Sequence, residues 1–151
     1  MSRYYDFLKS KMAIASDSGF EISTDKINAA LKPHQKDIVA WAIKGGKRAI
    51  FAKFGLGKSV MQIEYCKQII DHEGGKALII CPLGVKQEFT HDAINILGYS
   101  APEYVRTMAE VKASKNDILI TNYERVRDGD IDVTYFKATS LDEAEGVKNG
   151  L

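Results

Sequence analysis

The sequence predicts an α/β fold in which a mostly parallel sheet carries helices on both faces. Three short segments, at residues 48–52, 77–81 and 117–121, have the apolar character of strands that are buried on both sides. The segments between them repeat apolar residues with helical spacing and end at glycines. Such alternation of strand and helix favours a parallel sheet covered by helices.

The N-terminal part is predicted to be helical. Tyr4 to Met12 can form a short helix, and Thr24 or Asp25 can cap a second helix that runs through Leu31. We divide the chain into an N-terminal helical segment at residues 1–30, a main domain at residues 31–145 and a short tail at residues 146–151.

A longer helix is predicted to begin at Pro33, because the fixed φ of proline suits the first helical turn. Gly45 and Gly46 are expected to end it. Its apolar residues share one face, which is the pattern of a helix packed on a core. These residues are Ile38, Val39, Ala42 and Ile43.

Two further helices follow the same logic. One is predicted from Ser59 to His72, and Gly74 and Gly75 close it before the second apolar strand. The other carries apolar residues at every fourth position and ends at Gly98. Those apolar residues are Val85, Phe89, Ala93 and Leu97. A last strand is predicted at residues 137–141, where the sequence KATSL is more polar than the other strands.

Composition is that of one domain. The chain has 151 residues, 45% of them hydrophobic, which is enough for a single core and too short for two full-sized domains. The 21 basic and 20 acidic residues give a net charge of +1, so any contact with nucleic acid must be local. Cys66 and Cys81 form no metal-binding or redox motif, and no apolar run is long enough for a signal peptide or membrane span. We therefore expect a reduced cytoplasmic protein without membrane contact.

The strongest motif is AKFGLGKS, residues 52–59, which lies between a predicted strand and a predicted helix. Gly55 and Gly57 allow the backbone to bend so that successive N–H groups converge on phosphate oxygens. Lys58 can reach the β- and γ-phosphates of a nucleotide, and the hydroxyl of Ser59 can bind a bridging Mg²⁺. The alternative is a glycine-rich turn with a surface lysine, and Ala52 stands where the general motif has its first glycine.

The second motif is LDEA, residues 141–144, at the end of the last predicted strand. Asp142 can hold Mg²⁺ through its water shell, and Glu143 can polarise an attacking water. This pair of carboxylates favours hydrolysis of the nucleotide over transfer to an acceptor. The alternative is a solvated acidic turn.

In this order, AKFGLGKS, CPLGVKQEF, ITNYE and LDEA resemble motifs I, Ia, Ib and II of superfamily-two helicases. The Swi/Snf-like branch of DEAD-type ATPases, which has phage-borne members, is the most similar. The resemblance implies the first RecA-like lobe of a phosphate-loop NTPase that binds ATP and Mg²⁺ and acts on nucleic acid, with DNA favoured over RNA. It also implies the cytoplasm of a bacterium or of a phage-infected host cell.

The resemblance also assigns roles to individual residues. The nucleotide contacts are expected at Phe54, Gly55, Leu56, Gly57, Lys58 and Ser59, with Lys58 and Glu143 catalytic and with Ser59 and Asp142 on the metal. LKPHQ, residues 31–35, resembles the motif in which a glutamine reads adenine, so Gln35 is the candidate. Nucleic-acid backbone contacts are expected at Pro82, Lys86, Gln87, Thr121, Asn122 and Tyr123. Gln35 can instead be a solvated residue of a helix start, and Lys86 an ordinary surface lysine.

In that family a second RecA-like lobe completes the motor and supplies the arginine that stabilises the transferring phosphate. A second lobe, in cis or in trans, is therefore an expected partner, and slow hydrolysis is expected without it. Two other interpretations stay open: a nucleotide-binding module without enzymatic activity, and a small phosphate-loop kinase or GTPase. The last is less favoured because the chain has no N-K-x-D guanine motif.

Overall fold

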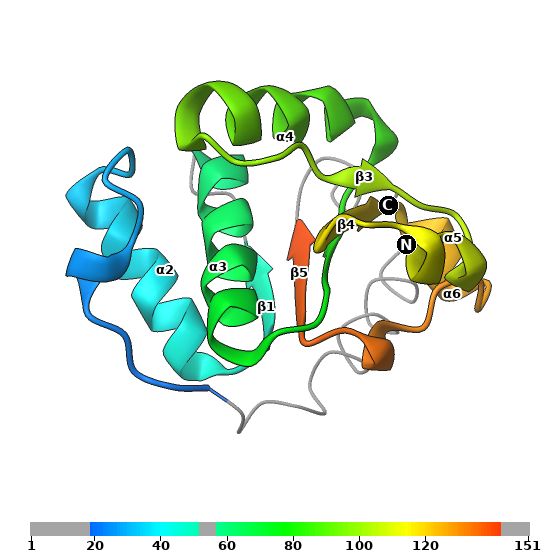
Figure 1. Ribbon diagram of the computed structural model, residues 1–151, viewed down its shortest axis with the longest axis horizontal. Coiled ribbons are helices and arrows are strands. Elements are labelled where there is room, and N and C mark those ends of the chain that lie inside the picture. Colours follow the sequence, from blue (N-terminus) through cyan, green and yellow to red (C-terminus); the bar gives the residue numbers. More distant parts are fainter. Residues whose placement is uncertain (1–18, 52–56, 143–151) are drawn as a thin grey trace.

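The computed structural model describes residues 19–51 and 57–142 (Figure 1). Its centre is a sheet of five strands, all parallel, in the order β1-β5-β2-β4-β3. The strands are β1 (Arg48–Phe51), β2 (Ala77–Ile80), β3 (Glu103–Tyr104), β4 (Ile118–Thr121) and β5 (Ala138–Asp142). The predicted α/β fold with a parallel sheet is thus confirmed.

Helices connect the strands. The α-helices are α2 (Pro33–Gly45), α3 (Lys58–Glu73), α4 (Lys86–Asp92), α5 (Met108–Ala113) and α6 (Tyr123–Arg127). A π-helical stretch, η4 (Ala93–Leu97), continues α4, and three single 3₁₀ turns are η2 (Thr24–Lys26), η3 (Leu83–Val85) and η5 (Val133–Tyr135). No helix in the described ranges is both long and apolar enough to cross a bilayer.

Each face of the sheet has its own apolar cluster. Helices α2, α3 and α4 cover one face of the sheet, and α5 and α6 cover the other (Figure 1). Ile79 and Ile120 belong to the apolar cluster of the first face, whereas Leu78 and Leu119 belong to that of the second. This alternation follows from the two-residue period of a strand. The chain moves across the sheet from β1 to β2 to β3 and then returns to β4 and β5. Crossovers of one constant hand place the outgoing and the returning helices on opposite faces.

The predicted boundaries of the longer helices are confirmed. Pro33 occupies the first turn of α2, and Gly46 is its C-terminal cap. Helix α3 ends at Gly74, with φ of 79°, and η4 ends at Gly98, with φ of 76°. A left-handed φ costs glycine little, so both glycines stop a helix at low cost.

Strand β5 is an internal strand of the sheet although its sequence is polar. It pairs with both β1 and β2, and all five of its residues are buried. The buried hydroxyls have partners: Ser140 Oγ donates to Gln62 Oε1 at 2.6 Å, and Thr139 Oγ1 accepts from Arg48 Nη1 at 3.1 Å. Hydrogen bonding of this kind makes burial of a polar strand tolerable.

The predicted helix from residue 24 to Leu31 is wrong. Only the single turn η2 forms, and Ser23 is its cap. Asn28 Oδ1 accepts from Ala30 N at 2.9 Å, and this local turn competes with a continued helix. Ile27 and Leu31 are nevertheless buried in the same cluster as α2. The helix predicted from Tyr4 to Met12 lies outside the described residues.

Three short elements, β3, α5 and α6, were not predicted. Strand β3 has two residues, too few for a visible alternation. Helix α5 has a sequence signal, since Thr107 caps it by accepting from Glu110 N at 3.2 Å. A threonine followed three residues later by a glutamate is a known helix start.

Candidate functional site

The predicted site residues gather at one edge of the sheet, because the carboxyl ends of parallel strands meet there. Lys58 follows β1, Pro82 follows β2, Asn122 follows β4 and Asp142 ends β5. Ligands of open parallel sheets bind outside this edge. The fold therefore gives these residues, which are distant in the sequence, one common location.

Only the end of the phosphate-loop motif belongs to the described residues; Ala52, Phe54, Gly55 and Leu56 lie outside them, as does Glu143. Gly57 has φ of 89° and stands at the N-terminus of α3, where no side chain caps the first backbone N–H groups. The N-terminus of a helix attracts anions through these N–H groups and its dipole. A phosphate group suits this position.

Lys58 and Asp142 form a buried ion pair. Lys58 Nζ lies 2.5 Å from Asp142 Oδ1, and the two side chains are 18% and 3% exposed. Asp142 ends β5, which pairs with β1, and Phe51 at the end of β1 is in register with Asp142. Lys58 follows β1 in the chain, at the start of α3. Burial raises the pKa of Asp142 above its ordinary value, and hydrogen bonding and charge from Lys58 offset only part of this effect. The carboxylate is therefore electrostatically under-compensated.

Lys58 Nζ is close to Asp142 Oδ1, but among the described residues this buried oxygen has no hydrogen bond of regular geometry. An oxygen of this kind suits a hard cation. Among the described residues, no three His, Cys, Asp or Glu side chains cluster as a metal site. Mg²⁺ needs no such cluster, because it keeps several waters and is held by one or two carboxylates together with phosphates. Asp142 thus fits the predicted Mg²⁺.

Ser59 is placed differently from its prediction. It is buried, and its hydroxyl donates to Asp92 Oδ2 on α4. The two predicted metal ligands, Ser59 and Asp142, therefore have different partners in this structure. Ser59 would have to release Asp92 before its oxygen could face a cation.

Gln35 is buried, at 7% exposure, which contradicts the alternative of a solvated helix start. Its Oε1 accepts from Lys32 N at 2.8 Å and so caps α2. Its Nε2 lies against Gly57: a Cβ added to Gly57 would be 2.1 Å from this nitrogen. Gln35 therefore stands directly beside the end of the phosphate loop.

The first predicted nucleic-acid segment is partly exposed. Pro82 is half-buried before η3, and Gln87 is exposed on α4. Lys86, half-buried at the start of α4, places its Nζ 4.9 Å from the centroid of the Tyr104 ring. This cation–π contact gives Lys86 a defined partner.

The second predicted segment is buried throughout, with Asn122 at 9% exposure. Thr121 is fully buried and donates to the carbonyl oxygen of Val105 at 2.8 Å, so it offers no surface in this structure. Asn122 Oδ1 accepts from Tyr104 Oη at 3.1 Å. Tyr123 is buried, and its hydroxyl donates to the carbonyl oxygen of Asp142. Asn122 thus contacts Tyr104, the partner of Lys86, whereas Tyr123 contacts Asp142.

Sequence reasoning missed Tyr104, which contacts both predicted segments. It lies on the two-residue strand β3, and no motif marked it. The only local signal was an aromatic residue next to valine in an otherwise polar stretch.

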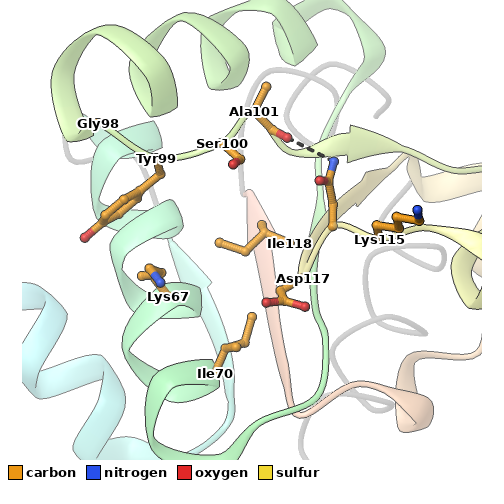
Figure 2. Close-up of a pocket in the computed structure, with 10 residues that line it drawn as sticks. Lys67, Ile70, Gly98, Tyr99, Ser100, Ala101, Lys115, Asp117 and Ile118 are labelled. Carbon is orange, nitrogen blue, oxygen red and sulfur yellow. Dashed lines mark hydrogen bonds between the residues drawn. The ribbon is translucent and has the colours of Figure 1, made fainter.

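A cavity of about 350 Å³ lies at the opposite edge of the sheet, where β4 begins (Figure 2). Lys67 and Ile70 of α3, Tyr99, and Asp117 beside Ile118 line it. None of the predicted site residues belongs to it. The candidate site at the carboxyl edge is therefore defined by its charged groups and backbone rather than by this cavity.

The sequence matches no protein-family model, and no curated protein is significantly similar to it. Any assignment of function to this chain thus depends on its own residues and on their arrangement at the carboxyl edge of the parallel sheet.

Proposed function

We propose that this chain is the RecA-like, ATP-binding lobe of a superfamily-two helicase or DNA translocase of the Swi/Snf-like kind. It would couple ATP hydrolysis to nucleic-acid remodelling together with a second lobe, in cis or in trans. The observation that carries the proposal is the ion pair between Lys58, at the start of α3, and Asp142, at the end of β5. A phosphate-binding lysine and a metal-binding carboxylate must lie at the same end of the sheet to act on one Mg-nucleotide.

In this proposal the nucleotide phosphates bind at the N-terminus of α3 and draw Lys58 away from Asp142. The freed Asp142 carboxylate then faces the cation. Bound Mg²⁺ would neutralise phosphate charge and orient the triphosphate. Glu143, next in the chain, would hold and polarise the attacking water.

The position of Gln35 supports adenine recognition as part of the proposal. Its amide group is buried against Gly57, and its Nε2 can donate to a base edge near the phosphate loop. Its Oε1 accepts the Lys32 N–H and, as an amide oxygen, keeps a second lone pair. One side chain can thus cap α2 and contact the base.

The test is Mg-dependent ATP binding by the 151-residue chain, measured by calorimetry. Lys58→Ala should raise the Kd for ATP by about tenfold or more, because it removes the contact between the lysine and the phosphates. A loss of roughly 1.4 kcal/mol of binding free energy corresponds to that factor. Lys67→Ala is the matched control, since Lys67 is also a lysine of α3 that pairs with an aspartate, here Asp71 at 3.0 Å. Equal ATP affinity in the wild type and Lys58→Ala would refute the nucleotide site.

A nucleotide-binding module without turnover is the second candidate. The four arginines among the described residues have other partners: Arg48 with Val133, Arg106 with Glu110, Arg125 with Asp130 and Arg127 with Asp128. None is thus bonded to the Lys58–Asp142 pair. Turnover in the presence of a second lobe and DNA would exclude this candidate.

A further inference from the structure

We infer that Tyr104 is a positioning residue for DNA-backbone binding, because it contacts both Lys86, which is half-buried, and Asn122, which is 9% exposed. The inference rests on the proposed function, in which those two residues contact nucleic acid. Tyr104 itself belongs to none of the motifs and is the shared neighbour of both segments.

The geometry places one ring between two loops. Lys86 Nζ lies 4.9 Å from the centroid of the Tyr104 ring, and the Tyr104 hydroxyl donates to Asn122 Oδ1 at 3.1 Å. Lys86 begins α4 after β2, and Asn122 precedes α6 after β4. Strand β3, at the edge of the sheet beside β4, carries Tyr104 toward both. The ring and the hydroxyl thus add a side-chain link between two segments that follow the neighbouring strands β2 and β4.

Each contact prepares a donor for a phosphate oxygen. The ring restrains the Lys86 stem while the ammonium keeps N–H donors for an anion. The hydrogen bond to Oδ1 orients the Asn122 amide, whose Nδ2 donates to Glu124 Oε1 at 2.7 Å and has a second hydrogen available. Lysine and asparagine donors of this kind position a nucleic-acid backbone without reading its sequence.

Arg125 adds positive charge beside the same tyrosine. It donates to Asp130 at 3.1 Å, and its hydrogen bonds to Asp130 and then to Tyr104 raise the pKa of Arg125. Glu124 and Asp130 bring negative charge to the same place, so the net field is small. Binding here must depend on direct contacts, and it should be sensitive to salt.

A second lysine–tyrosine pair provides a matched control. Lys112 Nζ lies 6.0 Å from the centroid of the Tyr135 ring, and Tyr135 is 44% exposed. This pair stands near the amino ends of β4 and β5, at the opposite edge of the sheet. Tyr135→Ala removes the same kind of lysine–tyrosine contact at a location where no DNA contact is proposed.

The experiment measures binding of labelled single-stranded and duplex DNA of about 16 nucleotides to the full chain by anisotropy, over a range of salt concentrations. Tyr104→Ala should weaken binding about fivefold, and Tyr135→Ala should leave it unchanged. Lys86→Ala should reduce the salt slope by about 0.7 on single strands or about 0.9 on duplex. Tyr104→Phe keeps the ring and should keep the wild-type salt slope.

A double-mutant cycle separates positioning from a general structural role. If Tyr104 acts through Lys86, then Lys86→Ala should cost much less affinity in the Tyr104→Ala background than in the wild type. Additive losses, or unchanged binding by Tyr104→Ala, would overturn the inference and leave the proposed function intact. A chain that binds ATP but no DNA would overturn the DNA part of the proposed function, and this inference with it. If thermal unfolding shows that Tyr104→Ala does not fold, a second cycle with Tyr104→Phe and Asn122→Ala decides. Both variants remove the same hydrogen bond, so their losses of DNA affinity should not add.

Discussion

Lys58 Nζ lies 2.5 Å from Asp142 Oδ1, so the lysine of the predicted phosphate loop is held by the carboxylate that is proposed to face Mg²⁺. Each group is the ion-pair partner of the other in this arrangement. A nucleotide with its cation would offer the lysine a phosphate and the carboxylate a metal ion. We therefore expect ATP and Mg²⁺ to bind cooperatively. Either ligand would weaken the Lys58–Asp142 ion pair, and this pair opposes the binding of the other ligand.

Asp142→Asn should make the stability of the chain less dependent on pH between acidic and neutral conditions. The folded-state pKa of Asp142 lies above the ordinary value of 3.8, so the folded state binds this proton more tightly than the unfolded chain does. The stabilising contribution of Asp142 is present below pH 3.8 and is lost as the pH rises through the folded-state pKa. In thermal unfolding from pH 3 to pH 8, the Tm of the variant should increase relative to that of the wild type as the pH rises. Each kcal/mol of difference in the free energy of unfolding corresponds to about 2–4 °C in Tm.

The control is Asp71→Asn, which removes an exposed aspartate from a Lys–Asp pair on α3. Its effect on stability should be small at every pH. A stability difference between Asp142→Asn and the wild type that stays constant from pH 3 to pH 8 would contradict the raised pKa of Asp142.

Gln35→Ala should reduce the preference for ATP over GTP and also weaken the cap of α2. Gln35→Glu separates these effects, because a carboxylate can still accept the Lys32 N–H but cannot donate to a base as Nε2 does. We expect Gln35→Glu to keep most of the stability and to lose the base preference. Calorimetric ATP and GTP affinities are the measurement, and an unchanged ratio in both variants would exclude base recognition by Gln35.

Gly57→Ala should both destabilise the chain and weaken nucleotide binding. The left-handed φ of 89° costs a non-glycine residue about 1–2 kcal/mol, and the new Cβ would collide with Gln35 Nε2. Gly84→Ala is the control, because a Cβ there meets no atom within 4 Å and the φ is not left-handed. Urea unfolding and ATP titration of both variants are the measurements, and equal behaviour would contradict the close approach of Gln35.

The 151-residue chain by itself should bind ATP but hydrolyse it slowly, with little stimulation by DNA. No described arginine is bonded to the Lys58–Asp142 pair, and a transition-state arginine is associated with roughly 10³-fold or more in rate. A second lobe should raise turnover by orders of magnitude, and Glu143→Gln should then abolish this gain while ATP binding is kept. Rapid DNA-stimulated turnover by the chain alone would contradict this expectation.

Local patterns predicted the elements whose packing is simple. Strands β2 and β4 are buried on both faces, so their sequences are apolar except for Thr121 at the end of β4. Helices α2 and α3 follow proline and glycine signals that act within a few residues. Strand β3 and the turn at Asn28 escaped prediction, because two residues show no period and a local side-chain hydrogen bond there outweighs helix propensity.

The candidate site was predicted only in part for a related reason. The motifs placed Lys58 at a helix start and Asp142 at a strand end, and both positions are as expected. The bond from Ser59 to Asp92 depends on how α4 packs against α3, which no local pattern encodes. Tyr104 contributes through contacts to two distant loops, and its own neighbours in the sequence reveal neither.

The sequence by itself determined the alternation of strands and helices, the glycine and proline boundaries, and the chemical types of residue that follow each strand. Those features depend on side-chain period and on local backbone preference. Only the tertiary structure decided that β5 lies between β1 and β2, that Lys58 meets Asp142, and that Gln35 packs against Gly57. Strand order is set by how the helices of each crossover bury their apolar faces on the two sides of the sheet, and this is a property of the whole packed chain.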